Sequence, residues 1–277
     1  MDLFKYYIEE GLQIELFLLS SIALFVFLTL VFLIALFLSR FMTNRRLKLE
    51  ERFEPIVEEL LFDVMFNDTP INELLNHRMY TRYHKKNIFM KMLIRSSFSM
   101  HQQFSGDIAE RLKKFYQTSA LKKYSIQKLN SNAWYKKCQG IRELSEMNQD
   151  DAVPDIVSLC FSKHQLVKQA AFVGIIKLKG IEGLKSLQKF TEFIDDWTLS
   201  HILMAIEETD STNFTDLNFL LQHKNPSMVL LGLRLIRYFS LPGYQKAISN
   251  VQEPLSSDRI QQEIQKHLQL LETRIKE

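Results

Sequence analysis

Residues 16–38 form an unbroken apolar run, LFLLSSIALFVFLTLVFLIALFL, and this run constrains the chain more than any other feature. It contains no charged residue, proline or glycine, and its polar residues are Ser20, Ser21 and Thr29. At about 1.5 Å per residue, such a helix reaches roughly 34 Å, which is enough to cross a hydrocarbon core of about 30 Å. The run therefore predicts a transmembrane helix over residues 16–39, preceded by a short extracytoplasmic tail of residues 1–15.

A cleavable signal peptide and a buried core helix are the two alternatives for this run. A signal peptide has a basic start, an apolar stretch of roughly 7–15 residues and a small-residue cleavage site. Here four acids and one base precede a longer run, and Ser39-Arg40-Phe41-Met42 offers no such cleavage site. A helix of this length is also hard to bury in a chain of 277 residues. The sequence therefore favours an anchor that is retained.

Basic residues set the expected orientation of this anchor, because cytoplasmic flanks carry an excess of lysine and arginine. Only Lys5 precedes the run, whereas a basic cluster follows it. We therefore expect a single-pass protein with its N-terminus outside and its C-terminal domain in the cytoplasm. Richness in Lys, Ile, Phe and Asn indicates an AT-rich bacterial genome, and hence a bacterial inner membrane. The cluster, expected to contact anionic lipid of the inner leaflet, comprises Arg40, Arg45, Arg46, Lys48 and Arg52.

Positive charge is concentrated in the membrane-proximal part of the chain. Residues 40–140 carry 19 Lys/Arg and 10 Asp/Glu, a net charge of +9, although the whole chain carries only +3. A basic side chain close to an anionic membrane contributes about 1 kcal/mol of binding. Two interpretations stay open for this basic helical region, residues 40–131. Its side chains either contact the inner leaflet or form solvated helix faces that merely satisfy the positive-inside bias.

Sparse glycine (8) and proline (6), together with apolar residues at spacings of three and four, indicate an all-α chain. Helices are predicted over residues 47–66, 85–101, 107–116 and 120–129. From residue 132, helical windows recur with a period of roughly 30 residues, which is typical of stacked helical arrays. Their centres are Cys138, Ala170, Ile202 and Leu231. Second helices are predicted over 154–161, 181–193, 214–221 and 244–251.

Two of these windows carry a resemblance to a known class of repeat. Residues 167–178 (VKQAAFVGIIKL) and 225–236 (NPSMVLLGLRLI) resemble the first helix of a HEAT or armadillo-type repeat, although Lys168 stands where better repeats have arginine. The resemblance covers about residues 132–255. It implies an all-α fold with an N-terminal transmembrane helix, a helical region and a HEAT-like α-solenoid over residues 132–277. An apolar stripe from Ile260 to Ile275 predicts its C-terminal cap helix; an irregular bundle is the alternative.

Catalytic motifs are sparse in this sequence. It contains no H-E-x-x-H, C-x-x-C, G-x-G-x-x-G or P-loop pattern, and its histidines never fall at metal-ligand spacing. Ser125–Lys128 and Ser186–Lys189 match S-x-x-K without the other elements of that enzyme class. We therefore expect no enzymatic activity, cofactor or metal. Cys138 and Cys160 are expected to be small core residues that form no disulfide in the cytoplasm.

Two tryptophans and one acidic pair have two interpretations each. Trp134 and Trp197 occupy near-equivalent places at helix starts, where a tryptophan either packs between neighbouring repeats or contacts a partner. Both are therefore candidate partner-binding residues. The acidic pair that begins at Asp195 precedes a helix, and capping the helix is expected of it rather than binding a cation.

The predicted function is a membrane-anchored, non-catalytic scaffold whose cytoplasmic repeats bind a membrane-associated protein partner. HEAT-like proteins of this layout resemble accessory components of bacterial membrane glycosyltransferases that make exported polysaccharide, and the resemblance implies a role of that kind. Neither nucleic acid nor a small-molecule substrate is expected. Two alternatives stay open: a nucleic-acid-binding HEAT-like protein, and an enzyme whose site is assembled from scattered polar groups.

Overall fold

The computed structural model describes residues 2–67, 69–209, 216–244, 247–248, 262 and 265–266. Every regular element within these residues is helical. In chain order the elements are α1 (Asp2–Phe66), α2 (Ile71–Asn76), α3 (Arg78–Tyr83), α4 (Asn87–Gln103), α5 (Asp107–Thr118), α6 (Ala120–Leu129), α7 (Trp134–Glu146), η1 (Asp150–Ala152), α8 (Val153–Leu159), α9 (Gln165–Lys179), η2 (Gly180–Leu187), α10 (Asp196–Glu208), α11 (Asn218–Leu221) and α12 (Pro226–Tyr238).

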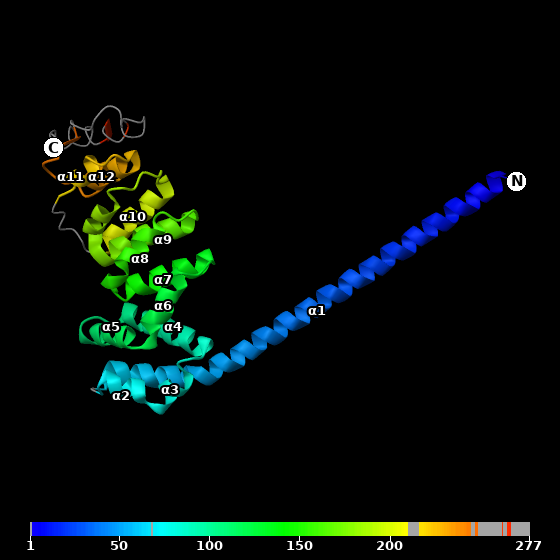
Figure 1. The fold of residues 1–277 in the computed structure, drawn as a ribbon, viewed down its shortest axis with the longest axis horizontal. Helices are drawn as coiled ribbons and strands as arrows, with labels where there is room; N and C mark the ends of the chain where they lie inside the picture. The colour runs from blue at the N-terminus through cyan, green and yellow to red at the C-terminus, as the bar shows by residue number, and fades with distance from the viewer. Residues whose placement is uncertain are drawn as a thin grey trace, which may run out of the picture.

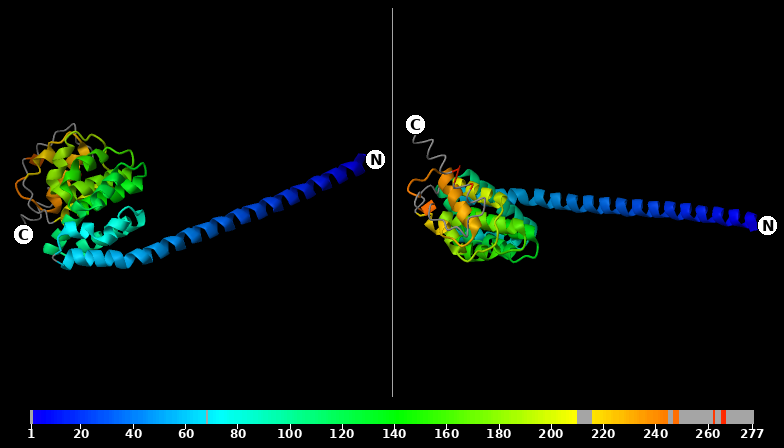
Figure 2. Two further views of the ribbon diagram at one scale, coloured as in Figure 1. Left: turned by 60° about the horizontal axis from the view of Figure 1, so that its bottom comes forward. Right: turned by 90° about the horizontal axis from the view of Figure 1, so that it is seen from above.

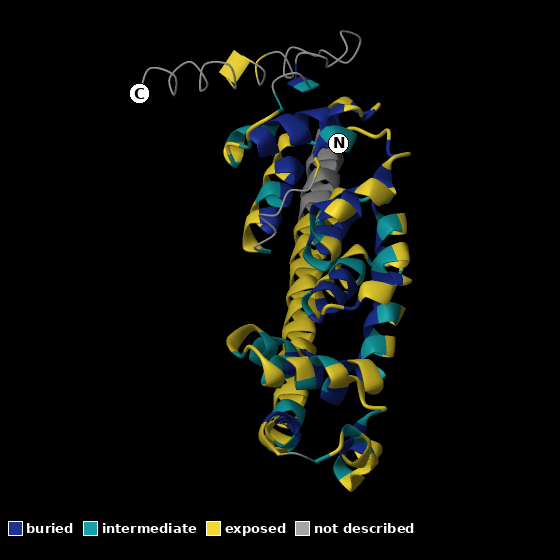
Figure 3. Ribbon diagram, turned by 90° about the vertical axis from the view of Figure 1, so that its left-hand side faces the viewer, coloured by how far each residue is buried: buried dark blue, intermediate teal, exposed yellow. Residues whose placement is uncertain are grey.

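Helix α1 is one unbroken helix of 65 residues, and it joins the predicted transmembrane helix to the predicted helix over residues 47–66. Every side chain from Glu15 to Lys48 is exposed, and Figure 3 shows the exposed colour along the rod until it enters the domain. The apolar run is therefore not buried against the rest of the described chain, and the buried-core alternative is wrong. Helix α1 is long and apolar enough to cross a membrane.

The last turns of α1 form part of the hydrophobic core of the domain. A stripe at helical spacing, Phe53, Val57, Leu61 and Val64, is at most 3% exposed. The Phe53 ring packs edge-on against Tyr83, with ring centroids 5.1 Å apart. The same helix thus changes from a rod with no partner to a core element, and its stripe fixes which side of the rod the domain occupies.

Two local features shape the end of α1. Pro55 lies inside the helix and removes one backbone hydrogen bond, which bends a helix, and Figure 2 shows α1 curving where it enters the domain. At the C-terminal end, the Arg111 guanidinium donates to the carbonyl oxygens of Val64 (2.8 Å), Thr69 (3.2 Å) and Asn67. A cation on these carbonyls satisfies them and complements the helix dipole. Helix α5 therefore holds the end of α1.

The remaining helices follow one another in chain order away from the C-terminal part of α1, as Figure 1 shows from α2 to α12. One hydrophobic core runs through them and is continuous across residue 131, the predicted start of the repeats. At that point α6 and α7 lie very close together. A Cβ atom on Gly140 would stand 2.8 Å from the Ser125 carbonyl oxygen, so only glycine fits there. The two predicted regions thus pack as one body.

Four of the helices, α4, α7, α9 and α10, point in the same direction. Phe53 and Phe66 of α1 pack against Phe89 and Phe104 at the two ends of α4, so α4 runs parallel to the end of α1. The last turns of all four helices then line one hollow of about 420 Å³, which includes His101, Glu146, Lys177 and Glu208. Their N-terminal ends therefore lie on the side from which α1 leaves the domain.

The second helix of each predicted pair departs most from the sequence-based expectation. Helix α8 (Val153–Leu159) covers most of the predicted helix over 154–161, but the predicted α-helix over 181–193 is wrong, because Gly180–Leu187 is the 3₁₀ helix η2. A Cβ atom on Gly183 would stand 2.5 Å from Ile175, and this close packing against α9 accompanies the tighter helix. In the described part of the third, residues 216–221, the helix α11 covers residues 218–221. Most of the fourth, and the cap helix except for isolated positions, lie outside the described residues.

The junction between α1 and the domain yields a matched pair of substitutions. Phe53→Ala removes a buried ring and is expected to lower the free energy of unfolding by about 3–5 kcal/mol. Phe62→Ala, on the same helix but 56% exposed, is expected to lower it by less than about 1 kcal/mol. Denaturant unfolding of the full-length protein in detergent measures both. Equal losses would contradict the burial of the Phe53 stripe.

Candidate functional site

The predicted membrane-contact residues lie along the exposed stalk of α1, between the apolar run and the buried stripe. Arg40, Arg45, Arg46, Lys48 and Arg52 are all exposed. Arg46 pairs with Glu50 one turn later, with Nε to Oε1 at 2.7 Å. An exposed pair of this kind contributes little to stability. The stalk is therefore a solvated helix whose basic side chains can reach either water or lipid headgroups.

A cleft opens between this stalk, α4 and α7. It consists of two adjoining hollows of about 550 and 560 Å³, which share Arg46, Lys91 and Arg95. The hollow on the stalk side also carries carboxylates of α1, whereas the hollow on the α7 side carries Arg142 above the Phe98 ring, 5.0 Å from its centroid. The cleft therefore combines a mixed-charge wall with a cationic and partly apolar wall.

A buried ion pair stands behind the cationic wall. Lys128 of α6 and Glu143 of α7 are 8% and 6% exposed, and the Lys128 Nζ lies 2.5 and 2.7 Å from the two Glu143 carboxylate oxygens. Ser125 donates to the same carboxylate at 2.5 Å and Gln139 at 2.9 Å. Burial lowers the pKa of Lys128, and the adjacent Glu143 charge raises it. Because Glu143 is neutralised here, it does not offset the cations of the cleft.

This cluster also contains the first S-x-x-K match, Ser125–Lys128. The Ser125 hydroxyl and the Lys128 ammonium are both directed to Glu143 inside the α6–α7 contact. In the second match, the Ser186 hydroxyl donates to the Gly183 carbonyl oxygen at 2.6 Å within η2, and Lys189 is exposed. Neither pair is arranged as a serine with a neighbouring lysine base.

The two predicted partner-binding residues are both exposed, and one of them also stacks against the start of a neighbouring helix. Trp134 at the start of α7 is 44% exposed and stacks on His164, which precedes α9, with ring centroids 4.7 Å apart. Trp197 in the first turn of α10 is 68% exposed and lies edge-on to His201. The packing interpretation thus holds in part for Trp134 and is wrong for Trp197. Both indoles are accessible to another molecule.

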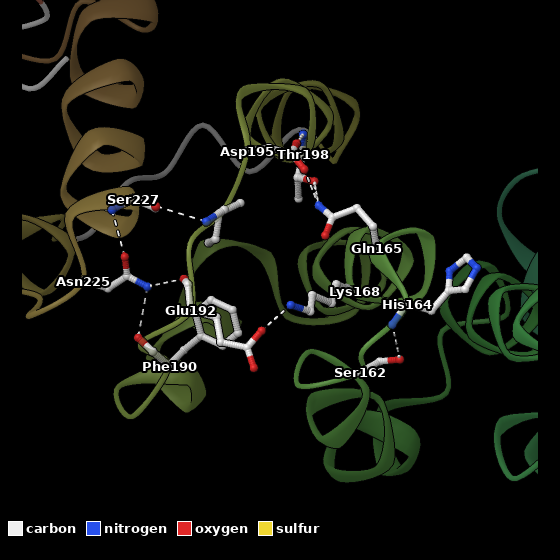
Figure 4. A network of polar contacts seen from close by, with 11 residues as sticks. Ser162, His164, Gln165, Lys168, Phe190, Glu192, Asp195, Thr198, Asn225 and Ser227 are labelled. Atoms are coloured by element: carbon white, nitrogen blue, oxygen red, sulfur yellow. Dashed lines mark hydrogen bonds and ion pairs between the residues drawn. The ribbon is translucent and has the colours of Figure 1, made fainter.

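Polar contacts fix the segment that leads into α10, as Figure 4 shows. The Asp195 carboxylate accepts from the Thr198 backbone N–H at 2.6 Å, so this residue is the helix cap that was predicted. The Asn225 side chain accepts from the Ser227 backbone N–H at 2.9 Å and donates to the Glu192 carbonyl oxygen at 2.7 Å. The Asp195 contact caps α10, and the Asn225 contacts tie the start of α12 to the segment that precedes Trp197.

The cysteines lie within the packed helices. Cys160 is buried and Cys138 is partly buried, and both are free thiols. Burial raises the pKa of the Cys160 thiol to about 12 and also raises that of Cys138. A thiol with a raised pKa is a poor nucleophile, which agrees with the expected core role.

The cleft and its buried ion pair were not anticipated from the sequence. Glu143 lies beside Ile141 and Leu144, both buried, and a carboxylate at such a position in an amphipathic helix is the signal that could have indicated a buried partner. Arg142 and Arg95 carry no comparable signal, because arginine on an exposed helix face is ordinary. Only the packing of α4 against α7 brings them together.

Among the described residues, no group of three or more histidine, cysteine or acidic side chains is placed to hold a metal ion. Comparisons of the chain with protein-family models, with curated proteins and with solved structures found no match. The site must therefore be interpreted from its own geometry.

The buried ion pair gives a sharp prediction on stability. Lys128→Met leaves the Glu143 carboxylate buried without its cation and is expected to lower the free energy of unfolding by about 3–5 kcal/mol. The double variant Lys128→Met/Glu143→Leu removes both charges and is expected to recover most of this loss. Denaturant unfolding of the single and double variants measures the difference. A double variant that is less stable than the single one would contradict this account.

The stability of the protein is expected to depend on pH through His101. Burial lowers its pKa below the usual value of 6.5, the Glu146 charge raises it, and Lys113 and Glu110 act in opposite directions. Because the folded pKa is depressed, the contribution to stability is fully present above pH 6.5 and is lost as the pH falls through the folded pKa.

We therefore expect His101→Gln to weaken the fall in melting temperature on the acid side of pH 6.5. His77→Gln, at an exposed histidine, is the control and is expected to leave the profile unchanged. Identical pH profiles for the wild type and His101→Gln would contradict the assignment.

Proposed function

We propose that this chain is a non-catalytic scaffold that α1 anchors in a membrane and that binds a membrane-associated protein partner through its helical domain. The observation that carries the proposal is the continuity of α1 from the apolar run into the core. From Leu38 to Phe53 the helix rises about 22 Å, at about 1.5 Å per residue. A rigid stalk of this length holds the domain beside the bilayer, where its partners must also lie.

Contacts between neighbouring helices support the interpretation of residues 132–277 as a HEAT-like α-solenoid. Lys177 of α9 pairs with Glu146 of α7 at 2.5 Å and approaches Glu208 of α10 at 3.5 Å. Trp134 and His164, which stack, precede or begin successive repeat helices. In each case the partners are separated by about one repeat period, which is what stacked repeats produce, because each unit buries its apolar face against the next. Such arrays present an extended surface to other proteins.

Two surfaces support partner binding. Trp197 is 68% exposed on a helix start that is held by its neighbours, and a rigid exposed indole is the side chain most enriched in binding hot spots. The cleft between the stalk, α4 and α7 supplies charge of both signs beside an apolar floor. A partner segment that reaches both would contact the domain on the side from which α1 leaves it.

The basic cluster of the stalk supports the proposed orientation. Five exposed cations, from Arg40 to Arg52, follow the apolar run, and this excess favours a cytoplasmic domain. Contact of these side chains with anionic lipid and location in a bacterial inner membrane belong to the same proposal. Association with a glycosyltransferase that makes exported polysaccharide stays a prediction of the HEAT resemblance.

Purification of the full-length protein in mild detergent tests the proposal. We expect a membrane protein to accompany the wild type reproducibly and to be lost, or greatly reduced, from Trp197→Ala. Tyr238→Ala removes another exposed aromatic side chain and is expected to retain the companion. Quantitative mass spectrometry of the three eluates measures the result.

Separate outcomes contradict separate parts of the proposal. A wild-type protein that stays soluble without detergent would overturn the anchor. Digestion of the domain by protease added outside intact cells would overturn the orientation. An anchored protein that is recovered alone, or whose companion is indifferent to Trp197→Ala, would overturn the partner surface.

A further inference from the structure

The common direction of α7 and α9 brings their N-terminal ends to one edge of the domain. Their C-terminal turns meet at the hollow that contains Glu146 and Lys177, so their first turns lie at the opposite end. This opposite end is on the side from which α1 leaves the domain, because α4 runs parallel both to them and to the end of α1. The edge therefore lies on the same side of the domain as the apolar run.

The side chains on this edge are aromatic and apolar, yet exposed. Trp134, Tyr135 and Leu166 are 44%, 56% and 45% exposed, and Phe161, which precedes α9, is 46% exposed. Trp134 and Tyr135 lie edge-on to each other, with ring centroids 6.0 Å apart. Tryptophan and tyrosine combine an apolar body with a polar tip, and both are enriched where protein meets the headgroup region of a bilayer.

Lysines flank these rings, and two carboxylates reach the α9 end of this edge, where Asp195 binds the Gln165 side chain and Glu192 pairs with Lys168. Lys136, Lys137 and Lys163 make no ion pair with any residue that the structure describes, and residues 131–137 and 161–168 contain no aspartate or glutamate. We call residues 131–137 and 161–166 the basic aromatic edge. Its charge is complementary to an anionic surface, and each lysine near such a surface favours the docked state about fivefold, or about 1 kcal/mol.

The path of α1 places this edge toward the bilayer. Figure 1 shows that the stack of helices and the rod of α1 rise on the same side of the C-terminal part of α1. The headgroup region adds about 5–8 Å to each face of the hydrocarbon core, and spanning helices tilt by about 20° on average. A tilt of the rod toward the stack brings the edge to the headgroups without any change within the domain.

We propose that the basic aromatic edge docks on anionic lipid headgroups of the leaflet from which α1 emerges. Trp134 and Tyr135 enter the interfacial region, and Lys136, Lys137 and Lys163 bind lipid phosphates. The domain then has two attachments to the membrane, α1 and this edge, which together fix its tilt. The inference rests on the anchor proposed above but not on the protein partner.

Trp197 provides a control within the same molecule. It also lies at a helix start and is more exposed than Trp134, but Glu192, Asp195 and Asp196 surround it in the sequence. Acidic side chains are repelled by an anionic surface. Because Asp195 and Glu192 contact Gln165 and Lys168 at the start of α9, we place the end of the lipid edge there, and Trp197 lies beyond it and stays available to a protein partner.

The two tryptophans are the only ones in the chain, so each can be observed alone. Full-length Trp197→Phe and Trp134→Phe variants are reconstituted into vesicles of phosphatidylcholine, with or without phosphatidylglycerol, that carry brominated acyl chains. Bromine quenches indole fluorescence at short range. Trp134 is expected to be quenched in the anionic vesicles, with a shift of its emission to shorter wavelength, and to lose this quenching in neutral vesicles or at high salt. Trp197 is expected to remain unquenched in all of them.

Charge variants separate the lipid contact from folding. In the Trp197→Phe background, Lys136→Gln/Lys137→Gln/Lys163→Gln is expected to lower the docked-to-undocked ratio about a hundredfold and abolish the quenching. Lys122→Gln/Lys123→Gln/Lys179→Gln removes the same charge at the opposite end of the helices, where Lys122 and Lys179 pair with residues of η1, and is expected to preserve it. Flotation with the vesicles reports on the anchor separately. Any of three results would overturn the proposal. Trp134 is not quenched in anionic vesicles that float with the protein, the two tryptophans are quenched equally, or the quenching of Trp134 does not change when the edge lysines are replaced.

Discussion

The arrangement of the domain depends on one helix that continues from the apolar run, through a bend at Pro55, into the core. A helix satisfies its backbone polar groups internally, so α1 can pass through lipid, water and packed protein without interruption. Only its side chains change between these surroundings, from the exposed apolar run to the buried stripe that contains Val57. Because this connection is a rigid rod, the stripe sets both the distance of the domain from the apolar run and the side of the rod on which it lies.

A few polar contacts fix the helices around this rod. Arg111 closes the end of α1, the Lys128–Glu143 pair joins α6 to α7, and Lys177 links three successive helix ends. Of these groups, Lys128 and Glu143 are buried and must be paired, because an isolated charge in the core is strongly unfavourable, whereas Arg111 and Lys177 are half-buried. Register and direction are thereby constrained more tightly than by apolar packing alone. Because α7 and α9 point in the same direction, the aromatic side chains at their N-terminal ends lie at one edge of the domain and their C-terminal turns lie at the opposite edge.

Sequence reasoning succeeded where the signal was local. The predicted helix over residues 120–129 matches α6, Trp134 begins α7, and Asp195 caps its helix as expected. The prediction of an α-helix over residues 181–193 was wrong, because the apolar spacing did not reveal the close packing of Gly183 against α9 in η2. The exposure of Trp197 was equally beyond prediction, because the apolar character of a residue does not reveal whether another segment covers its side chain. The HEAT-like solenoid stays a prediction that the contacts between successive helices support.

The sequence by itself determined that the chain is helical, that the run over residues 16–38 is apolar enough to cross a bilayer, and that positive charge follows that run. These are properties of composition and of short-range spacing, which need no partner in space. Only the tertiary structure decided that α1 is continuous with the core, that Glu143 neutralises Lys128, and that Trp134 and Trp197 both remain exposed. These features join residues that are distant in the sequence, or depend on what covers a side chain, and packing alone determines both.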